Sequence, residues 1–177
     1  MSKRLKERKF IELRPRICEK RGRIGDAEAD FIVSGKTGKG VLLIVVDRKS
    51  RAPFLEQILK ISLKNVSQAF IRIKSRFKEM KTITLDNDLL FQHHKDLEKL
   101  LNAKIYFCHP YHSWEKGTVE NVNKHIRKDI PKGSDISKYS KKFIKNLENK
   151  LQRRIMACLN HLTPLEVLTN SRQQKKR

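Results

Sequence analysis

The sequence predicts an α/β fold in which helices cover a five-stranded mixed sheet. Two observations support this prediction. Three apolar segments follow one another with only short turns between them, and two further apolar segments are separated by stretches with helical spacing of their apolar residues. Short turns favour antiparallel pairing of the first three strands, whereas helical crossovers imply parallel pairing of the last two. The expected sheet therefore has three antiparallel strands followed by two parallel strands.

The antiparallel strands are expected at residues 31–34, 41–46 and 52–59. Residues 41–46 read VLLIVV, an unbroken apolar and largely β-branched run that is typical of a strand buried on both faces. Glycines between residues 35 and 40, and the charged segment DRKSR at 47–51, supply the turns that join these strands.

Helices are expected where apolar residues recur every three or four positions. The first, over residues 63–79, carries on one face Leu63, Val66, Phe70, Ile73 and Phe77. Two short strands, at 82–85 and 104–107, enclose a second helix near 90–101. The last two helices each bury one stripe, formed first by Val119, Val122 and Ile126 and then by Ile144, Leu147, Leu151 and Ile155.

The charge of the chain indicates a polyanionic partner. Its 177 residues include 41 Lys or Arg and 19 Asp or Glu, which gives a net charge of +22. Nucleic acid is preferred over an anionic membrane surface, because the basic residues are spread along the whole chain and form no basic amphipathic helix. We expect one domain at residues 24–168, preceded by a basic arm at 1–23 and followed by a basic tail at 169–177, whose last residues, QQKKR at 173–177, are expected to be disordered.

Neither membrane insertion nor secretion is expected. No apolar run approaches the ~20 residues of a membrane-spanning helix, and no apolar segment of a signal peptide follows the basic N-terminus. The cysteines, at positions 18, 108 and 158, are odd in number and contain no C-x-x-C pair, which fits a reducing cytoplasm.

Three acidic residues stand out in this basic chain. Asp30 lies at the first strand, Asp86 ends the fourth, and Glu120 lies on the helix after the fifth. If the first and fourth strands are neighbours, these carboxylates can converge and offer the oxygen ligands that Mg²⁺ prefers. Read alone, such residues are more often caps, turn formers or solvent-facing side chains, so the residues themselves leave both interpretations open.

The motifs around these acids resemble a known family. VENVNKHIRK at 119–128, preceded by PY at 110–111 and WEKG at 114–117, resembles the glutamate helix of DDE transposases and retroviral integrases. More narrowly, the chain from about Ile11 to Leu168 resembles the catalytic, integrase-like domain of transposases of the insertion-sequence-thirty family. The motifs that carry this resemblance, in order, are IELRPRICEKRGRIGD, DRKSR, TLDN with Phe91, the YF–PY–W–KG–ENVN series, IPKG and TPLEVL.

The resemblance implies a ribonuclease-H-like fold and metal-dependent DNA strand cleavage and strand transfer during transposition. Such in-line phosphoryl transfer needs no covalent link between protein and DNA. Asp30, Asp86 and Glu120 fall on the family's three acidic, metal-binding positions, and the implied cofactor is Mg²⁺ or Mn²⁺, with two ions expected. Asp26 is the alternative first acid. Asp30 is preferred because an apolar strand follows it directly.

Spacing along the Glu120 helix and the charged DRKSR turn suggest which residues contact DNA. Asn123, Lys124 and Arg127 lie three, four and seven positions after Glu120 and share its face of the helix. The other candidate contacts to DNA phosphates are Lys116, Arg48 and Arg51. The implied partners are transposon ends and target DNA in the bacterial cytosol or nucleoid, with a homodimer as one possible assembly.

The chain also departs from the family pattern. It reads AEAD at 27–30 where the family usually has Trp-Glu-Gly-Asp, and Asp88 stands where Asp-Asn is usually followed by Gly. Family members carry an N-terminal helix-turn-helix region, which this chain is expected to lack. The alternative function is therefore that of a truncated, catalytically inactive DNA-binding remnant of such a transposase.

Overall fold

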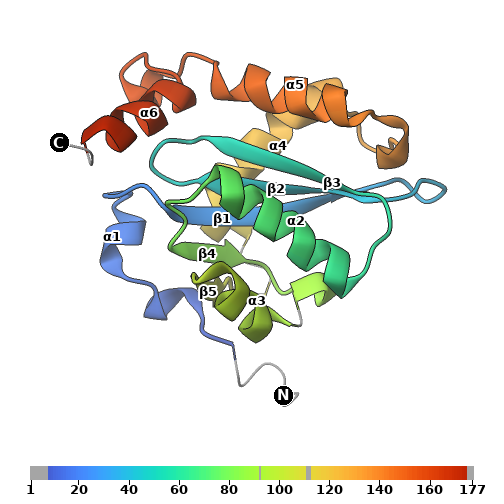
Figure 1. Ribbon diagram of the computed structural model, residues 1–177, viewed down its shortest axis with the longest axis horizontal. Helices are drawn as coiled ribbons and strands as arrows, with labels where there is room; N and C mark the ends of the chain where they lie inside the picture. The colour runs from blue at the N-terminus through green and yellow to red at the C-terminus, as the bar shows by residue number, and fades with distance from the viewer. Residues whose placement is uncertain (1–7, 92, 111–112, 175–177) are drawn as a thin grey trace.

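The structure is a computed structural model that describes residues 8–91, 93–110 and 113–174. Its centre is a five-stranded sheet in the order β3-β2-β1-β4-β5 (Figure 1). The strands are β1 (Asp26–Val33), β2 (Val41–Asp47), β3 (Pro53–Ile58), β4 (Thr82–Leu85) and β5 (Lys104–Phe107). The β1–β2 and β2–β3 pairs are antiparallel, whereas β1–β4 and β4–β5 are parallel. The predicted mixed sheet of an α/β fold is confirmed.

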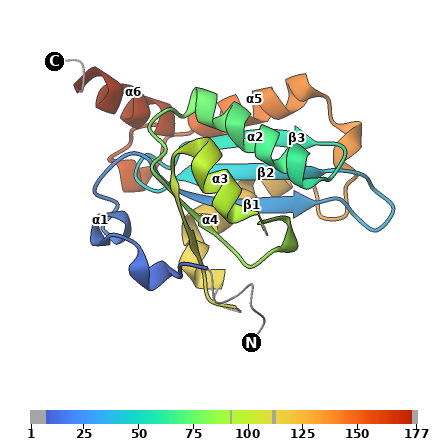
Figure 2. The ribbon, with the colours of Figure 1, turned by 60° about the horizontal axis from the view of Figure 1, so that its bottom comes forward.

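Helices cover both faces of this sheet. They are α1 (Arg16–Glu19), α2 (Leu63–Arg76), α3 (His94–Leu101), α4 (Gly117–Asp129), α5 (Lys141–Gln152) and α6 (Pro164–Gln174). Figures 1 and 2 show α2 and α3 on one face and α4 on the opposite face, where α4 and α5 share a hydrophobic cluster with the sheet. Within the described ranges, every helix is too short or too polar to span a bilayer.

Strand β2 explains how one sheet supports two cores. Its side chains alternate between the two faces of the sheet. Val41, Leu43 and Val45 belong to the core on the α2 side, while the residues at 42, 44 and 46 belong to the core on the α4 side. All of them are fully buried, which confirms the strand predicted from the VLLIVV run.

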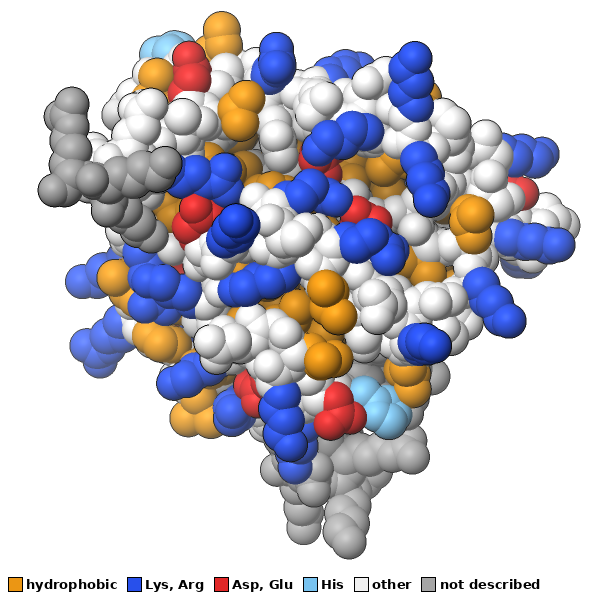
Figure 3. Space-filling view, in the orientation of Figure 1, with side chains coloured by type: hydrophobic (Ala, Val, Ile, Leu, Met, Phe, Trp, Pro, Cys, Tyr) orange, Lys and Arg blue, Asp and Glu red, His pale blue; other side chains and the backbone are white. Residues whose placement is uncertain are grey.

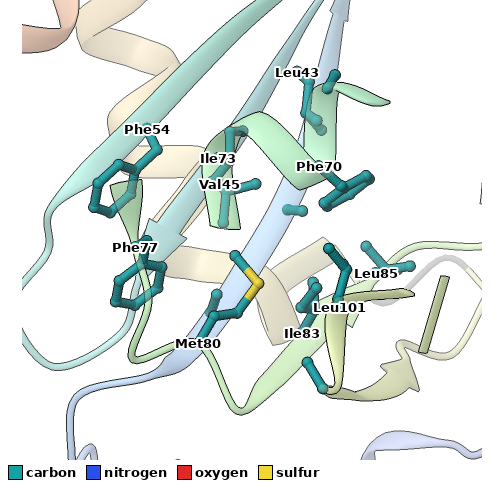
Figure 4. Close-up of a cluster of buried hydrophobic side chains, with 14 of the residues drawn as sticks. Leu43, Val45, Phe54, Phe70, Ile73, Phe77, Met80, Ile83, Leu85 and Leu101 are labelled. Atoms are coloured by element: carbon teal, nitrogen blue, oxygen red, sulfur yellow. The ribbon is translucent and has the colours of Figure 1, made fainter. Parts of the chain in front are cut away.

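The core on the α2 side is rich in aromatic residues. Phe70 and Ile73 of α2 lie over the sheet beside Val45, as Figure 4 shows. Phe54 of β3 stacks on Phe77, which follows α2, with ring centroids 4.8 Å apart. This packing holds α2 against the antiparallel half of the sheet.

The first strand is longer than predicted. It begins at Asp26, and its residues pair along β2 from Ala27 opposite Asp47 to Val33 opposite Val41. The hydrophobic pattern did not predict this part of the strand, because polar residues alternate with alanines there. As a consequence, Asp30 lies inside a strand of the sheet and does not precede one.

The C-terminal part of the chain also differs from the prediction. The last long helix ends at Gln152, and Ile155, expected in its buried stripe, is 67% exposed. Beyond it, α6 begins with a capping box, in which the backbone N–H of Thr163 donates to Glu166 Oε2 at 2.7 Å and Thr163 Oγ1 accepts the Glu166 backbone N–H at 3.2 Å. Helix α6 extends into the predicted basic tail and includes Gln173 and Gln174 of the QQKKR segment expected to be disordered, whereas residues 175–177 lie outside the described residues.

The first described residues lie against the parallel edge of the sheet. The Phe107 backbone N–H donates to the carbonyl of Lys9 at 2.8 Å. Cys18 is fully buried, and Arg14, which is 6% exposed, donates to Thr84 Oγ1 at 2.9 Å. This part of the predicted basic arm therefore packs on the sheet.

Candidate active site

Parallel pairing of β1 and β4 brings two of the predicted acids together. In this ladder Asp26 lies opposite Thr82 and Glu28 opposite Thr84. The same register, continued by two residues, places Asp30 beside Asp86, which directly follows β4. Since alternate residues of a strand share a face, Asp30 points to the same side of the sheet as Glu28.

A single lysine ammonium joins the two aspartates. Lys116 Nζ lies 3.1 Å from Asp86 Oδ2 and 3.3 Å from Asp30 Oδ1, and it also donates to the carbonyl of Ala29 at 3.3 Å. The residue is 5% exposed. Burial alone would lower the pKa of Lys116, but the charges of Asp30 and Asp86 outweigh burial and raise it above its ordinary value. The bridging group is therefore a cation at neutral pH.

Helix α4 lies over the same pair of acids. In the second turn of the helix, Asn123 Nδ2 donates to Asp30 Oδ2 at 2.8 Å, while Lys116 at the N-cap holds the other oxygen. Glu120 lies between these two residues along the helix, three positions before Asn123 and four after Lys116. It is partly exposed and forms no hydrogen bond or ion pair with the residues that the structure describes.

The arrangement brings Asp30 and Asp86 together but does not close a three-carboxylate cluster. Across residues 8–91, 93–110 and 113–174, no group of three or more His, Cys, Asp or Glu side chains is placed to hold a metal ion. The expected convergence of three acids on one cation site is thus found only for the two aspartates, and these are held by Lys116.

Asp26, the alternative first acid, lies at the other end of β1. Its carboxylate is fully buried and accepts hydrogen bonds from Arg23 at 2.9 and 3.0 Å and from Thr82 Oγ1 at 2.9 Å. Burial raises the pKa of Asp26, but the hydrogen bonds from Arg23 and Thr82 lower it by more. The pKa of Asp26 therefore lies below its ordinary value. Asp30 is therefore the aspartate of β1 that shares a partner with Asp86.

Glu28, which the sequence did not single out, fixes the start of α4. Its side chain is fully buried between Asp26 and Asp30 on the same face of β1. Glu28 Oε2 accepts the backbone N–H of Val119 at 2.9 Å, and Oε1 pairs with Arg48. An anionic group at a helix N-terminus is favourable, so Glu28 sets the position of the turn that carries Glu120.

The segment after Asp86 is anchored by aromatic stacking. Phe91, which is 1% exposed, stacks on Phe31 with ring centroids 5.0 Å apart and meets the edge of Phe70 at 6.2 Å. Phe31 is the neighbour of Asp30 in β1. This aromatic series therefore ties the segment that follows Asp86 to the strand that carries Asp30.

A second cation lies close to this segment. Arg8 Nη1 donates to Asn87 Oδ1 at 2.6 Å, and Asn87 Nδ2 donates to the carbonyl of Cys108 at 2.8 Å. The Arg8 guanidinium also lies 4.5 Å above the centre of the Phe107 ring. No sequence motif marks Arg8, because its contacts depend on how the N-terminal segment packs against β5.

The candidate DNA contacts fall into two groups. Lys124 is exposed, Arg127 is partly exposed with Nη1 3.3 Å from the Pro131 carbonyl, and Arg51 donates to Thr118 Oγ1 at 3.0 Å. Arg48, in contrast, is 7% exposed and paired with Glu28, so the expectation that it contacts phosphate is replaced by a structural role. Lys116 is likewise turned inward in this structure.

Comparison with known proteins identifies relatives among transposases. No protein-family model matches the chain. The transposase for insertion sequence element IS4351 of Bacteroides fragilis is 40% identical over 157 residues, which cover 88% of this chain and 48% of that protein. The transposase InsI for insertion sequence element IS30A of Escherichia coli is 30% identical over 162 residues, which cover 89% of this chain and 41% of that protein. The chain thus spans about half the length of the curated relatives that it matches.

Solved structures show the same fold. The catalytic core domain of BIV integrase matches with a TM-score of 0.65 at 15% identity, covering 86% of this chain and 99% of that one. At this identity the likeness establishes the fold alone, and it confirms the predicted ribonuclease-H-like architecture. Over most of its own length, the chain is therefore similar in sequence to the transposases of the insertion sequence elements IS4351 and IS30A, and it shares the fold of an integrase catalytic core domain.

Proposed function

We propose that this chain is the catalytic domain of a DDE-type transposase, which cleaves DNA strands and transfers them to target DNA with divalent cations. One observation carries the proposal: two aspartates from neighbouring parallel strands share one cation at the end of the sheet, beneath the helix of Glu120. The proposed ligands are Asp30, Asp86 and Glu120. Sequence similarity supports this assignment, since the relatives are transposases.

The residues around the site fit Mg²⁺ or Mn²⁺. Asp30 and Asp86 already accept one shared cation, the Lys116 ammonium. Beside them, Asn123 Oδ1 is buried without a hydrogen-bond partner among the described residues, and it is a further hard oxygen donor. Two such ions, when bound, would activate the attacking oxygen and stabilise the leaving oxygen of a phosphodiester. The protein itself orients the ligands, because Glu28 fixes the start of α4 and the aromatic series of Phe91 anchors the segment after Asp86.

DNA is the proposed substrate, and the bacterial cytosol and nucleoid are the proposed location. The net charge of +22 gives long-range attraction to a polyanion. On the face shown in Figure 3, Lys and Arg side chains are spread widely and do not gather in a single patch. Such a distribution favours contact with an extended, uniformly charged partner. A homodimer also remains part of the proposal, and a solved neighbour of this fold comes from an intasome, that of simian T-cell lymphotropic virus.

The test of this function is a nicking assay on supercoiled plasmid DNA with Mg²⁺ or Mn²⁺. The wild-type chain is expected to nick the plasmid only with the divalent cation present. Glu120→Gln, which removes one proposed ligand charge and keeps the side-chain shape, is expected to abolish nicking while DNA binding persists. Glu19→Gln, at an exposed position of α1, serves as the matched control.

A different outcome would favour the alternative function. If wild type and Glu120→Gln bind DNA equally and neither nicks it with either cation, the chain is an inactive DNA-binding remnant. Nicking that is equal in both variants would show that Glu120 is not a ligand, and the proposed triad would be wrong.

Lys124 offers a separate test of the DNA surface. Lys124→Ala is expected to weaken DNA binding to a similar extent for all sequences and to reduce the slope of log K against log salt concentration by about 1, because one phosphate contact is lost. Fluorescence anisotropy of a labelled duplex across a salt series measures both quantities. An unchanged salt slope would remove Lys124 from the interface.

A further inference from the structure

We propose that the Lys116 ammonium is a resident counter-ion, which holds the cation position between Asp30 and Asp86 until a divalent cation replaces it. This inference rests on the proposed function, since it takes the two aspartates as metal ligands. It assigns to Lys116 a role in metal entry, distinct from the DNA contact suggested by the sequence.

The geometry of Lys116 supports direct competition. Its ammonium lies 3.1 Å from Asp86 Oδ2 and 3.3 Å from Asp30 Oδ1, so it uses one oxygen of each carboxylate. Only the Ala29 carbonyl completes its described contacts, at 3.3 Å. A divalent cation that takes the same two oxygens would remove both anionic partners of the ammonium. It would also place like charges within a few ångströms of each other, where repulsion is strong in a partly buried site.

Because Lys116 is buried, its ammonium depends on Asp30 and Asp86 as anionic partners. The residue is 5% exposed, and a buried ammonium without anionic partners is costly. In the same way, two aspartates side by side repel each other when no cation separates them. The ammonium therefore stabilises the metal-free site, and either cation alone can satisfy the two carboxylates.

The position of Lys116 in the chain allows its ammonium to move away from Asp30 and Asp86. Lys116 ends the short 3-10 turn Ser113–Lys116 and is the N-cap of α4, so its side chain is not fixed within the body of a helix. The next residue, Gly117, has open space where a Cβ would lie. Once displaced, the ammonium would be available beside the acids for the DNA phosphate contact expected from the sequence.

The decisive experiment measures Mn²⁺ binding to the full chain by titration calorimetry. Lys116→Met, which keeps an unbranched apolar side chain and removes the competing charge, is expected to bind Mn²⁺ at least about tenfold more tightly than wild type. Lys116→Arg keeps the charge and is expected to bind no more tightly than wild type. Lys128→Met, at an exposed position near the end of α4, makes the same change in net charge and is expected to leave the affinity within about twofold.

A wild-type measurement covers the case in which Lys116→Met fails to fold. Amine-reactive labelling followed by mass spectrometry is expected to modify Lys116 slowly without metal and several-fold faster with saturating Mn²⁺, while Lys128 reacts at one rate throughout.

Three outcomes distinguish a failure of the Lys116 proposal from a failure of the proposed transposase function. Tighter Mn²⁺ binding by Lys116→Met, or metal-dependent labelling of Lys116, supports the exchange of the Lys116 ammonium for a divalent cation. Equal or weaker binding by Lys116→Met, with Lys116 labelling independent of Mn²⁺ and binding lost in Asp30→Asn, overturns the exchange but leaves the metal site in place. If wild type and Lys116→Met both fail to bind Mn²⁺ and wild type does not nick DNA, the proposed function fails, and the inference fails with it.

Discussion

Glu28→Ala is expected to lower the free energy of unfolding by about 3–5 kcal/mol, the range for breaking a buried ion pair from one side. Glu28 is fully buried, and its carboxylate accepts both the Arg48 guanidinium and the Val119 backbone N–H. The variant leaves Arg48 buried without its anion and the Val119 N–H without its acceptor. Urea denaturation followed by circular dichroism measures the change.

A double-mutant cycle identifies the cause. Glu19→Ala removes the same atoms from an exposed position and is expected to change stability by less than about 0.5 kcal/mol. Glu28→Met combined with Arg48→Met replaces both charges by apolar side chains and is expected to cost less than either single substitution. If the double variant is as unstable as the sum of the two single variants, Glu28 and Arg48 are not coupled and the ion pair does not explain the loss.

Phe91→Ala is expected to lower the free energy of unfolding by about 3–5 kcal/mol, the usual cost of removing a buried phenylalanine ring. Phe91 packs between Phe31 and Phe70 and is 1% exposed. The cavity would open directly behind the segment that follows Asp86. Thermal and urea unfolding measure the loss of stability.

Two control variants test whether the loss of stability comes from the volume removed at a buried position. Phe91→Leu keeps an apolar side chain of intermediate size and is expected to cost much less than Phe91→Ala. Leu100→Ala, on α3 and 58% exposed, is expected to fall within about 0.5 kcal/mol of wild type. A loss below about 1 kcal/mol for Phe91→Ala would show that the segment after Asp86 is held by other contacts.

The hydrophobic pattern predicted most of the fold because it reports burial directly. The VLLIVV run predicted a strand with two buried faces, and the stripe from Leu63 to Phe77 predicted α2. The pattern missed residues 26–30 of β1, since Asp26, Glu28 and Asp30 are polar and yet lie in the sheet. It also missed α6, which buries only Pro164 and Leu168 among its described side chains.

The candidate site was predictable only in outline. The sequence places Asp86 at a strand end and predicts its approach to Asp30 only on the condition that the first and fourth strands are neighbours, and the structure shows that they pair in parallel. Partners within the site depend on how α4 crosses the sheet, which no local pattern encodes. Arg48 illustrates this limit: in the sequence it belongs to a charged turn, and only the fold shows that a buried carboxylate lies within its reach.

The sheet order has a consequence for the way the chain folds. Strand β1 pairs on one side with β2, its neighbour in sequence, and on the other with β4, which follows only after β3 and α2. The β1–β2–β3 meander can therefore form early from local contacts, whereas docking of β4 must first close a long loop, at an entropic cost that slows it. On a ribosome, Asp30 would be in place well before Asp86 is synthesised, and the pair could assemble only after that later half had emerged.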